Sequence, residues 1–554
     1  MSDDDLRIQL DLKIPMRDGV RLHTVVYRPA HGERFPVLLI RSPYGTQHPR
    51  YVEWAARFAR SGYGVVMQDC RGRYESEGEW RPYIDETNDG YDTQQWVGAQ
   101  PWCDGNIGTF GTSYVGFTQI LPATLRSLYV KALVPIANQE DNYGHLRCNG
   151  VLQLQNAMNF LALGQRMLLP VHIELIDLKT VYRRLPLISA LDDLADRPFY
   201  REMIRHERFD EFWRSYSMKG RYGEVDVPAY FITGWYDNLM HEMFKCFRGW
   251  KHEARTPDVR AQTKLLVGPW PHSTIGTPAT GDVHFGHAAA VDIPGAHLRW
   301  YDRRLKRIDN GIDDEAPIRL FVMGENVWRD ESEWPLARTQ YTKFYLHSGG
   351  RANSFFGDGI LSLDPPDNEP PDTFTYDPDH PVPTLGGQSM FMENTGPKDR
   401  RPVERRDDVL VYSTAPLPHD LEVTGPVELT LYAASSAPDT DFTATLVDVH
   451  PDGRAIHLCE GIVRARFRES CEASTLITPG IIYAYTISLW ETSNLFKAGH
   501  CIRLEVSSSN FPRFDRNLNT GQPAGFDTNM QIAHQTVYHN PHCPSHLTLP
   551  VIPR

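Results

Sequence analysis

The sequence predicts an α/β protein with a mainly parallel sheet, interrupted by a helical insertion and followed by an all-β domain. Short apolar runs alternate with helical patterns at the start of the chain and again after the insertion. Between them lies a block rich in Leu, Met, Arg and Glu at helical spacing, with almost no strand-like run. We therefore expect a core formed by residues 1–142 and 226–337, a helical cap at 143–225 and a β-sandwich at 338–554.

The core segments are defined by short apolar runs that have the length of buried strands. Their order along the chain predicts βαβ units, because Val52–Ala59 has helical spacing between the first two runs. The strand candidates are Val37–Ile40, Tyr63–Met67, Lys131–Ile136, Ala229–Thr233 and Lys264–Val267. The insertion separates the third run from the fourth. Helices packed around the core, rather than a lid over it, are the alternative interpretation of that insertion.

The C-terminal part begins after a Pro-rich stretch at 361–385, where neither a helix nor a central strand can form. Beyond it, short alternating runs separated by Gly, Pro and Asn predict an antiparallel β-sandwich or jelly roll. These runs are Val409–Tyr412, Val427–Tyr432, Phe442–Asp448, Tyr483–Leu489 and Ile502–Val506.

Composition excludes several classes of protein. The 554 residues are 41% hydrophobic, enough for a sizeable core in each part. The net charge of −13 is spread along the chain without a basic stripe, so we expect no nucleic-acid partner. No run approaches the ~18 apolar residues of a membrane span, and we expect no membrane association. Self-association as a homo-oligomer stays open.

The eight cysteines are scattered and contain no C-x-x-C pair. This spacing supports neither a disulfide framework nor a structural zinc site, and it favours reduced thiols. The acidic start of the chain is unlike a secretory signal. We therefore expect a cytoplasmic protein, and one that needs no metal or organic cofactor.

Gly111-Thr-Ser-Tyr-Val-Gly116 contains a G-x-S-x-x-G pattern, close to the G-x-S-x-G turn that presents a nucleophilic serine. An apolar stretch, Ile107–Phe110, precedes it, and Val115–Leu128 is compatible with a helix. A nucleophile on such a strand-to-helix turn needs small neighbours, because the backbone is crowded there. The context favours Ser113 as a nucleophile over an ordinary turn serine.

A serine hydroxyl needs a base to accept its proton and an acid to orient that base. Asp237 follows the run Ala229–Thr233, and His272 follows Lys264–Val267, so both lie where parallel strands gather catalytic groups. The order Ser, Asp, His is that of α/β-hydrolases. His284 and His287 are rival bases, and Asp282 is a weaker rival acid.

Several motifs together resemble the cocaine-esterase-like α/β-hydrolases, which are related to X-prolyl dipeptidyl peptidases, α-amino-acid ester hydrolases and glutaryl cephalosporin acylases. The resemblance covers essentially the whole chain. It rests on Arg41-Ser-Pro-Tyr-Gly45, Asp69-Cys-Arg-Gly72, Ser76-Glu-Gly78, Asp89-Gly-Tyr-Asp92 with Trp96, Gly108-Thr-Phe-Gly-Thr-Ser-Tyr114, Gly234-Trp-Tyr-Asp237, Gly268-Pro-Trp-Pro-His272 and Gly425-Pro-Val-Glu428.

The resemblance implies an α/β-hydrolase core, a helical cap and a C-terminal jelly roll. It also implies that the Tyr44 hydroxyl and the backbone N–H of Tyr114 form the oxyanion hole; Tyr44 as a loop aromatic under the cap is the alternative. Arg71 and the Asp89–Trp96 stretch are interpreted as structural.

The related amino-acid ester hydrolases hold the substrate ammonium with a cluster of acidic residues. In this chain Asn238-Leu-Met follows Asp237, so no such cluster stands beside the predicted triad acid. Acids elsewhere in the fold could supply such a cluster.

The sequence therefore predicts a serine hydrolase that cleaves a small carboxylic ester, or an amide, through an acyl-enzyme on Ser113, Asp237 and His272. An X-prolyl dipeptidyl peptidase or β-lactam acylase on the same residues is the alternative within the enzyme class. From another class, the alternative is a carbohydrate- or protein-binding protein with an inactive hydrolase core.

Overall fold

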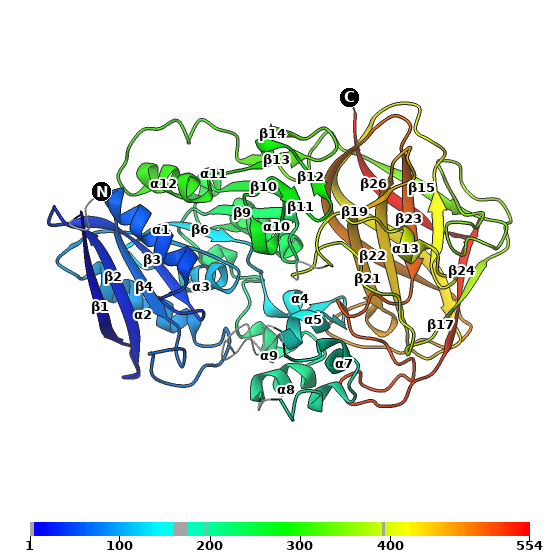
Figure 1. Ribbon diagram of the computed structural model, residues 1–554, viewed down its shortest axis with the longest axis horizontal. Coiled ribbons are helices and arrows are strands. Elements are labelled where there is room, and N and C mark those ends of the chain that lie inside the picture. The colour runs from blue at the N-terminus through cyan, green and yellow to red at the C-terminus, as the bar shows by residue number, and fades with distance from the viewer. Residues whose placement is uncertain (1–4, 160–174, 195–196, 391–393, 554) are drawn as a thin grey trace.

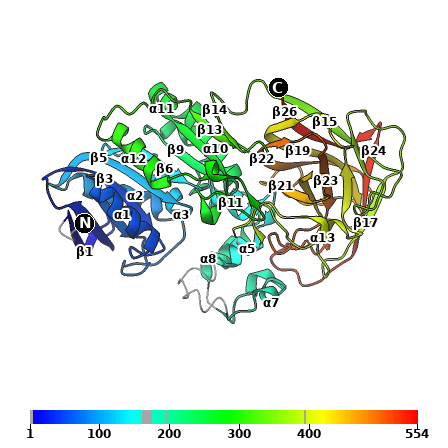
Figure 2. The same ribbon diagram turned by 45° about the horizontal axis from the view of Figure 1, so that its top comes forward.

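The computed structural model describes the chain except for residues 1–4, 160–174, 195–196, 391–393 and 554. An α/β core lies at one end of an elongated molecule and a β-rich C-terminal domain at the other (Figure 1). The short helices of the insertion lie below and between them. The same arrangement is visible when the molecule is turned (Figure 2).

The core contains a ten-stranded sheet in the order β1-β2-β4-β3-β5-β6-β9-β10-β13-β14. The strands from β4 to β13 in this order pair in parallel, while β1, β2 and β14 are antiparallel to their neighbours. The predicted runs lie in these strands: β3 (Phe35–Ser42), β4 (Gly64–Asp69), β6 (Val130–Ile136), β9 (Tyr230–Tyr236) and β10 (Lys264–Pro271). The other strands are β1 (Leu6–Pro15), β2 (Arg21–Pro29), β5 (Cys103–Thr112), β13 (Ile318–Val322) and β14 (Val327–Glu331).

The central strands read as continuous apolar runs because helices cover both faces of the sheet. Val37 and Leu39 of β3 join one buried cluster, and Leu38 and Ile40 join another on the opposite face. The first cluster is completed by α3 (Tyr114–Ala123) and the second by α1 (Pro49–Arg60) and α12 (Ile293–Arg304). The predicted helix at 52–59 is therefore confirmed as part of α1.

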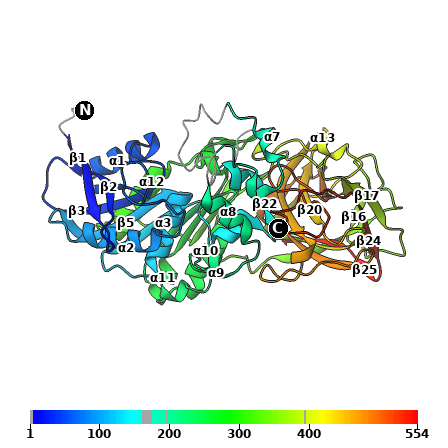
Figure 3. The same ribbon diagram turned by 90° about the horizontal axis from the view of Figure 1, so that it is seen from below.

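The described part of the insertion consists of short helices and one small hairpin. The helices are α4 (Asn142–Leu146), α5 (Leu154–Asn156), α7 (Leu178–Tyr182), α8 (Pro198–Arg205) and α9 (Glu211–Arg214). The insertion contacts the core through the hydrogen bond from Tyr222 to Glu140, and it contacts the C-terminal domain where Leu152 N–H donates to Asp515. Figure 1 shows α8 and α9 below α10 (Met240–Glu253), and in the view from below they overlap it (Figure 3). Residues 160–174 and 195–196 of the predicted cap at 143–225 lie outside the described residues.

The C-terminal domain is built from a twelve-stranded, largely antiparallel sheet around a large buried apolar cluster, and it contains two smaller clusters as well. All five predicted runs are strands: β18 (Leu410–Ser413), β19 (Leu421–Ser435), β20 (Asp441–Val449), β22 (Tyr483–Phe496) and β23 (Cys501–Ser507). Within the Pro-rich stretch, β17 (Asp372–Tyr376) is an edge strand of this sheet and pairs with β24 (Ala533–Asn540). An edge strand tolerates neighbouring prolines because one of its sides makes no ladder hydrogen bonds. In the described part of the chain, no helix is long and apolar enough to cross a membrane.

Candidate active site

Ser113 lies in the turn between β5 and α3, with a φ of 68° and a ψ of −127°. A non-glycine residue holds this conformation only when its surroundings impose it. The Ser113 N–H donates to Ile136 O on the neighbouring strand, and its carbonyl accepts from the N–H of Phe117. A Cβ added to Gly111 would lie 2.1 Å from Cγ1 of Val115, so the strand can approach the helix this closely only with glycine there. The turn therefore has the geometry of a nucleophile elbow.

Asp237 and His272 follow two adjacent parallel strands, β9 and β10. Tyr236 pairs with Pro271 in the ladder, so the next residue of each strand lies at the same edge of the sheet. Oδ1 of Asp237 lies 2.9 Å from Nδ1 of His272. The buried carboxylate also accepts from the Thr233 hydroxyl and the Leu239 N–H. These donors fix the carboxylate, which in turn fixes the imidazole ring.

Tyr44 lies in the loop after β3, and its side chain is hydrogen-bonded to Ser113. The loop is held by Thr46 N–H, which donates to Asp69, and by Arg73, which donates to Pro43 O. Burial raises the pKa of the Tyr44 phenol far above its ordinary value. The hydroxyl therefore stays protonated at physiological pH and is available as a donor beside Ser113.

Tyr114 contributes its backbone at the N-terminus of α3, while its ring is buried below the turn. Its hydroxyl accepts from Tyr83 N–H at 2.8 Å and donates to Glu86 at 2.8 Å. The ring also stacks on Tyr83 with centroids 4.4 Å apart. The Tyr114 side chain is thus packed and hydrogen-bonded inside the protein. Any role of Tyr114 towards a substrate would therefore fall to its backbone N–H.

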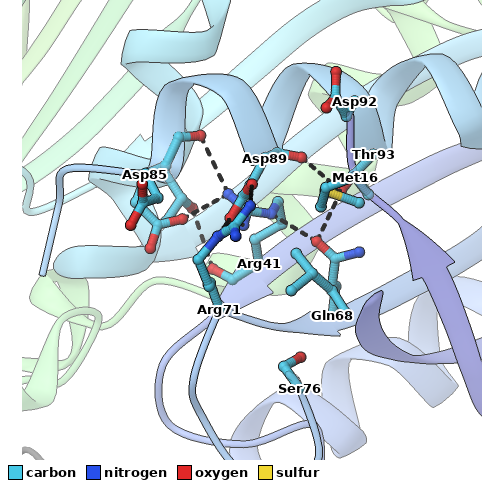
Figure 4. Close-up of polar contacts among 12 residues, drawn as sticks. Met16, Arg41, Gln68, Arg71, Ser76, Asp85, Asp89, Asp92 and Thr93 are labelled. Carbon is cyan, nitrogen blue, oxygen red and sulfur yellow. Dashed lines mark hydrogen bonds and ion pairs between the residues drawn. The ribbon is translucent and has the colours of Figure 1, made fainter. Parts of the chain in front are cut away.

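A buried polar network joins β3 and β4 to α2 (Glu86–Gly98) (Figure 4), and Glu86 connects it to Tyr114 of α3. Arg41 donates to Glu86 and to Gln68, at 2.6 and 2.7 Å. Arg71 pairs with Asp89 and with Asp18 on the surface. Arg41, Arg71 and Asp89 belong to the motifs Arg41–Gly45, Asp69–Gly72 and Asp89–Asp92, and their contacts are structural.

The rival residues named from the sequence lie on the hairpin of β11 (Ala279–Thr280) and β12 (Val283–His284) and just after it. His284 and His287 are exposed, and their rings pack against each other with centroids 5.9 Å apart. Asp282 is paired with Lys398. None of these contacts resembles the buried acid and base pair of Asp237 and His272.

Sequence reasoning missed a group of carboxylates near the candidate triad. Glu140, Asp141 and Glu242 offer oxygens within 4.8 Å of one another and line a cavity of about 350 Å³. Lys245 lies among them, with Nζ 2.6 Å from Glu242. Burial and then the charge of Glu242 raise the pKa of Asp141 to about 7. The acids come from two separate segments, so no local motif marks them.

His145 of α4 lies between this cluster and the triad. Its pKa is lowered to about 4, first by burial and then by the charge of His272, while Glu242 and Asp237 raise it. Among the described residues, neither ring nitrogen of His145 has a hydrogen-bond partner. The imidazole is therefore neutral where it borders the candidate site.

The fold and the site define a serine hydrolase of the α/β class, and comparison with known proteins agrees. Residues 18–274 match the family X-Pro dipeptidyl-peptidase (S15 family), and residues 310–548 match the X-Pro dipeptidyl-peptidase C-terminal non-catalytic domain. The chain is 40% identical to the cocaine esterase of Rhodococcus sp. (strain MB1 Bresler) over the whole of both chains. It belongs to the cocaine-esterase-like members of this family, which are serine hydrolases acting on esters.

Two solved structures share the architecture along the full chain. An α-amino acid ester hydrolase is 25% identical with a TM-score of 0.84, covering 100% of this chain and 98% of its own. An aminopeptidase from a marine-sediment Thaumarchaeota archaeon is 24% identical with a TM-score of 0.85, covering 99% and 97%. The second likeness concerns the fold alone.

Proposed function

We propose that Ser113, Asp237 and His272 form a catalytic triad that hydrolyses a carboxylic ester through an acyl-enzyme. The observation that carries this proposal is the contact of 2.9 Å between the Asp237 carboxylate and His272 Nδ1, at the sheet edge where Ser113 sits in a strained turn. A carboxylate on Nδ1 holds the proton there and leaves Nε2 as the base.

In the first half-reaction, Ser113 Oγ attacks the ester carbonyl carbon while its proton passes to Nε2 of His272. The negative charge that develops on the carbonyl oxygen is met by the Tyr44 hydroxyl and the Tyr114 N–H. The tetrahedral intermediate then expels the alcohol, which takes the proton from His272. Water repeats the sequence on the acyl-enzyme and releases the carboxylic acid.

We propose further that the acyl group carries no free ammonium. Recognition of an ammonium needs a carboxylate whose charge is uncompensated. Of the acids near the triad, Glu242 already holds the Lys245 ammonium, and burial raises the pKa of Glu140 and the pKa of Asp141, the latter to about 7, which favours their neutral forms. A substrate ammonium would have to displace the Lys245 ammonium or bind close to it against their mutual repulsion. Neutral acyl groups are therefore the favoured substrates over aminoacyl esters and Xaa-Pro amides.

Single-turnover kinetics with a panel of substrates test both parts of the proposal. A p-nitrophenyl ester whose acyl group carries no amino group should give a burst of one nitrophenolate per chain, followed by slower turnover. The matched aminoacyl ester and an Xaa-Pro anilide should have a lower kcat/KM. Absence of any turnover would favour a binding protein with an inactive core, and preference for the Xaa-Pro anilide would favour the peptidase alternative.

For the rest of the molecule, we propose that residues 338–554 form a jelly roll, that 143–225 act as the cap, and that the protein works in the cytoplasm. Support for the jelly roll comes from largely antiparallel strands that enclose a large apolar cluster. Support for a reducing compartment comes from the eight cysteines, all of which are free thiols.

A further inference from the structure

A second cavity, of about 240 Å³, lies between the core and the C-terminal domain. Tyr236 and Phe285 line it from the core, and Leu458 lines it from the C-terminal domain. Tyr236 directly precedes Asp237, but successive residues at the end of a strand point to opposite sides. The cavity is therefore separate from the side on which Asp237 meets His272.

Two imidazoles and one carboxylate converge on this cavity. Asp448, His450 and His500 offer ligand atoms that all lie within 4.8 Å of one another. Nδ1 of His500 lies 2.7 Å from Oδ1 of Asp448, and Nε2 of His450 lies 4.0 Å from Oδ2. The two rings are 4.4 Å apart and inclined by 38°. The carboxylate thus lies within reach of both histidines.

The backbone holds these three residues in place. Asp448 lies near the end of β20 (Asp441–Val449), and His450 is the first residue after that strand; both line the cavity. The turn after β20 is closed by His450 N–H donating to Arg454 O. His500 precedes β23, whose Ile502 pairs with Asp448 in the ladder. Two neighbouring strands therefore present the donors at one end of the sheet.

The donor set suits a divalent transition metal. Neutral imidazole and carboxylate are ligands of Zn²⁺ and of the ions that share its preferences. Bonds of about 2.0–2.2 Å place the ligand atoms of such an ion within about 4 Å of one another, so small side-chain rotations are enough here.

We propose that Asp448, His450 and His500 bind one divalent transition-metal ion of the zinc type, with water in the cavity completing its coordination. Partial burial excludes bulk water from the donors: 8% of the Asp448 side chain, 28% of His450 and 11% of His500 are exposed. Lys497 also lines the cavity but is exposed, so its ammonium can remain in water. The ion would stabilise the end of the β20–β23 pair and take no part in ester cleavage.

Uptake of Zn²⁺ by the full-length protein, stripped with a chelator, tests this proposal directly. Equilibrium dialysis should give one Zn²⁺ per chain, and thermal unfolding should shift to higher temperature when Zn²⁺ is added. Co²⁺ should compete and give the visible absorption bands of nitrogen ligation, whereas Ca²⁺ should not compete because it prefers oxygen ligands. Wild-type protein that takes up no Zn²⁺ would overturn the proposal.

Variants locate the ion. His450→Gln removes one imidazole and should raise the Kd for Zn²⁺ by at least about 100-fold, since loss of an outer-shell partner alone costs up to about that much. The matched control is the double variant His284→Gln/His287→Gln, which removes the exposed pair of histidines near β12 and should bind Zn²⁺ normally. His450→Gln should keep esterase activity. If His450→Gln binds like the wild type, or the control variant loses the ion, this site is not the one that binds it.

Discussion

Oδ1 of Asp237 lies 2.9 Å from Nδ1 of His272, although 35 residues separate them in the chain. The contact follows from the sheet, because Tyr236 at the end of β9 pairs with Pro271 at the end of β10 and each residue is the first after its strand. The Leu239 N–H donates to the same oxygen of Asp237, and the Thr233 hydroxyl donates to the other. An acid held in this way can keep one tautomer of the imidazole without itself taking up the proton.

Replacing Asp237 by Asn should lower kcat by roughly 10³–10⁴-fold. The amide keeps the volume but allows His272 to present the wrong nitrogen to Ser113. The loss should be smaller than that of Ser113→Ala. Steady-state kinetics with a p-nitrophenyl ester measure it, and Asp282→Asn, on the surface beside Lys398, is the matched control. Normal kcat in Asp237→Asn would remove Asp237 from the triad.

Tyr44→Phe removes a single hydroxyl next to Ser113 and keeps the ring. If that hydroxyl stabilises the oxyanion, kcat should fall by about 10²–10³-fold. KM should change little, because the oxyanion exists only near the transition state. Thermal unfolding of the variant should match the wild type. A variant with normal kcat and stability would mean that Tyr44 serves packing and that the hole has another donor.

The base can be assigned by comparing three histidines. His272→Gln should reduce hydrolysis by about 10³-fold or more, whereas His284→Gln and His287→Gln should leave it close to normal. Both rivals are exposed and packed on each other, away from any buried acid. Activity lost in either rival variant, but retained in His272→Gln, would show the assignment to be wrong.

Stability should decrease on acidification, in part because of His145. Its pKa is about 4 in the folded protein and near 6.5 when unfolded, so below pH 6.5 the unfolded state binds more protons. The free energy of unfolding then falls by up to about 1.4 kcal/mol per pH unit until the pH reaches the folded value. The free energy of unfolding, measured with urea between pH 7 and pH 4, should fall less steeply in His145→Leu than in the wild type. An unchanged pH slope in a folded variant would contradict this role.

The sequence predicted the elements whose signals are local. β3, β6, β9 and β10 are continuous apolar runs, and the residues that follow β5, β9 and β10 pointed to Ser113, Asp237 and His272. The antiparallel β1 and β2 were not predicted: β1 is largely exposed, and in the largely buried β2 polar residues interrupt the apolar signal. The insertion was expected as longer helices, but α8 and α9 are only eight and four residues long. Their aromatic residues satisfy tertiary packing rather than helix formation.

Contacts between distant segments could not be predicted in this way. The Tyr114 hydroxyl meets Glu86, and Glu140 approaches Glu242, only because the sheet order brings their elements together. Asp448 and His500 likewise meet through the pairing of β20 with β23. Spacing along the chain carries no signal for such pairs.

Labelling with a fluorophosphonate tests the central claim most directly, because the reagent forms a covalent adduct with an activated serine. Mass spectrometry of the digested protein should find one adduct per chain, on the peptide that contains Ser113. Labelling should be lost in Ser113→Ala and strongly slowed in His272→Gln. An adduct on a different serine, or undiminished labelling of Ser113→Ala, would contradict the assignment of Ser113 as the nucleophile.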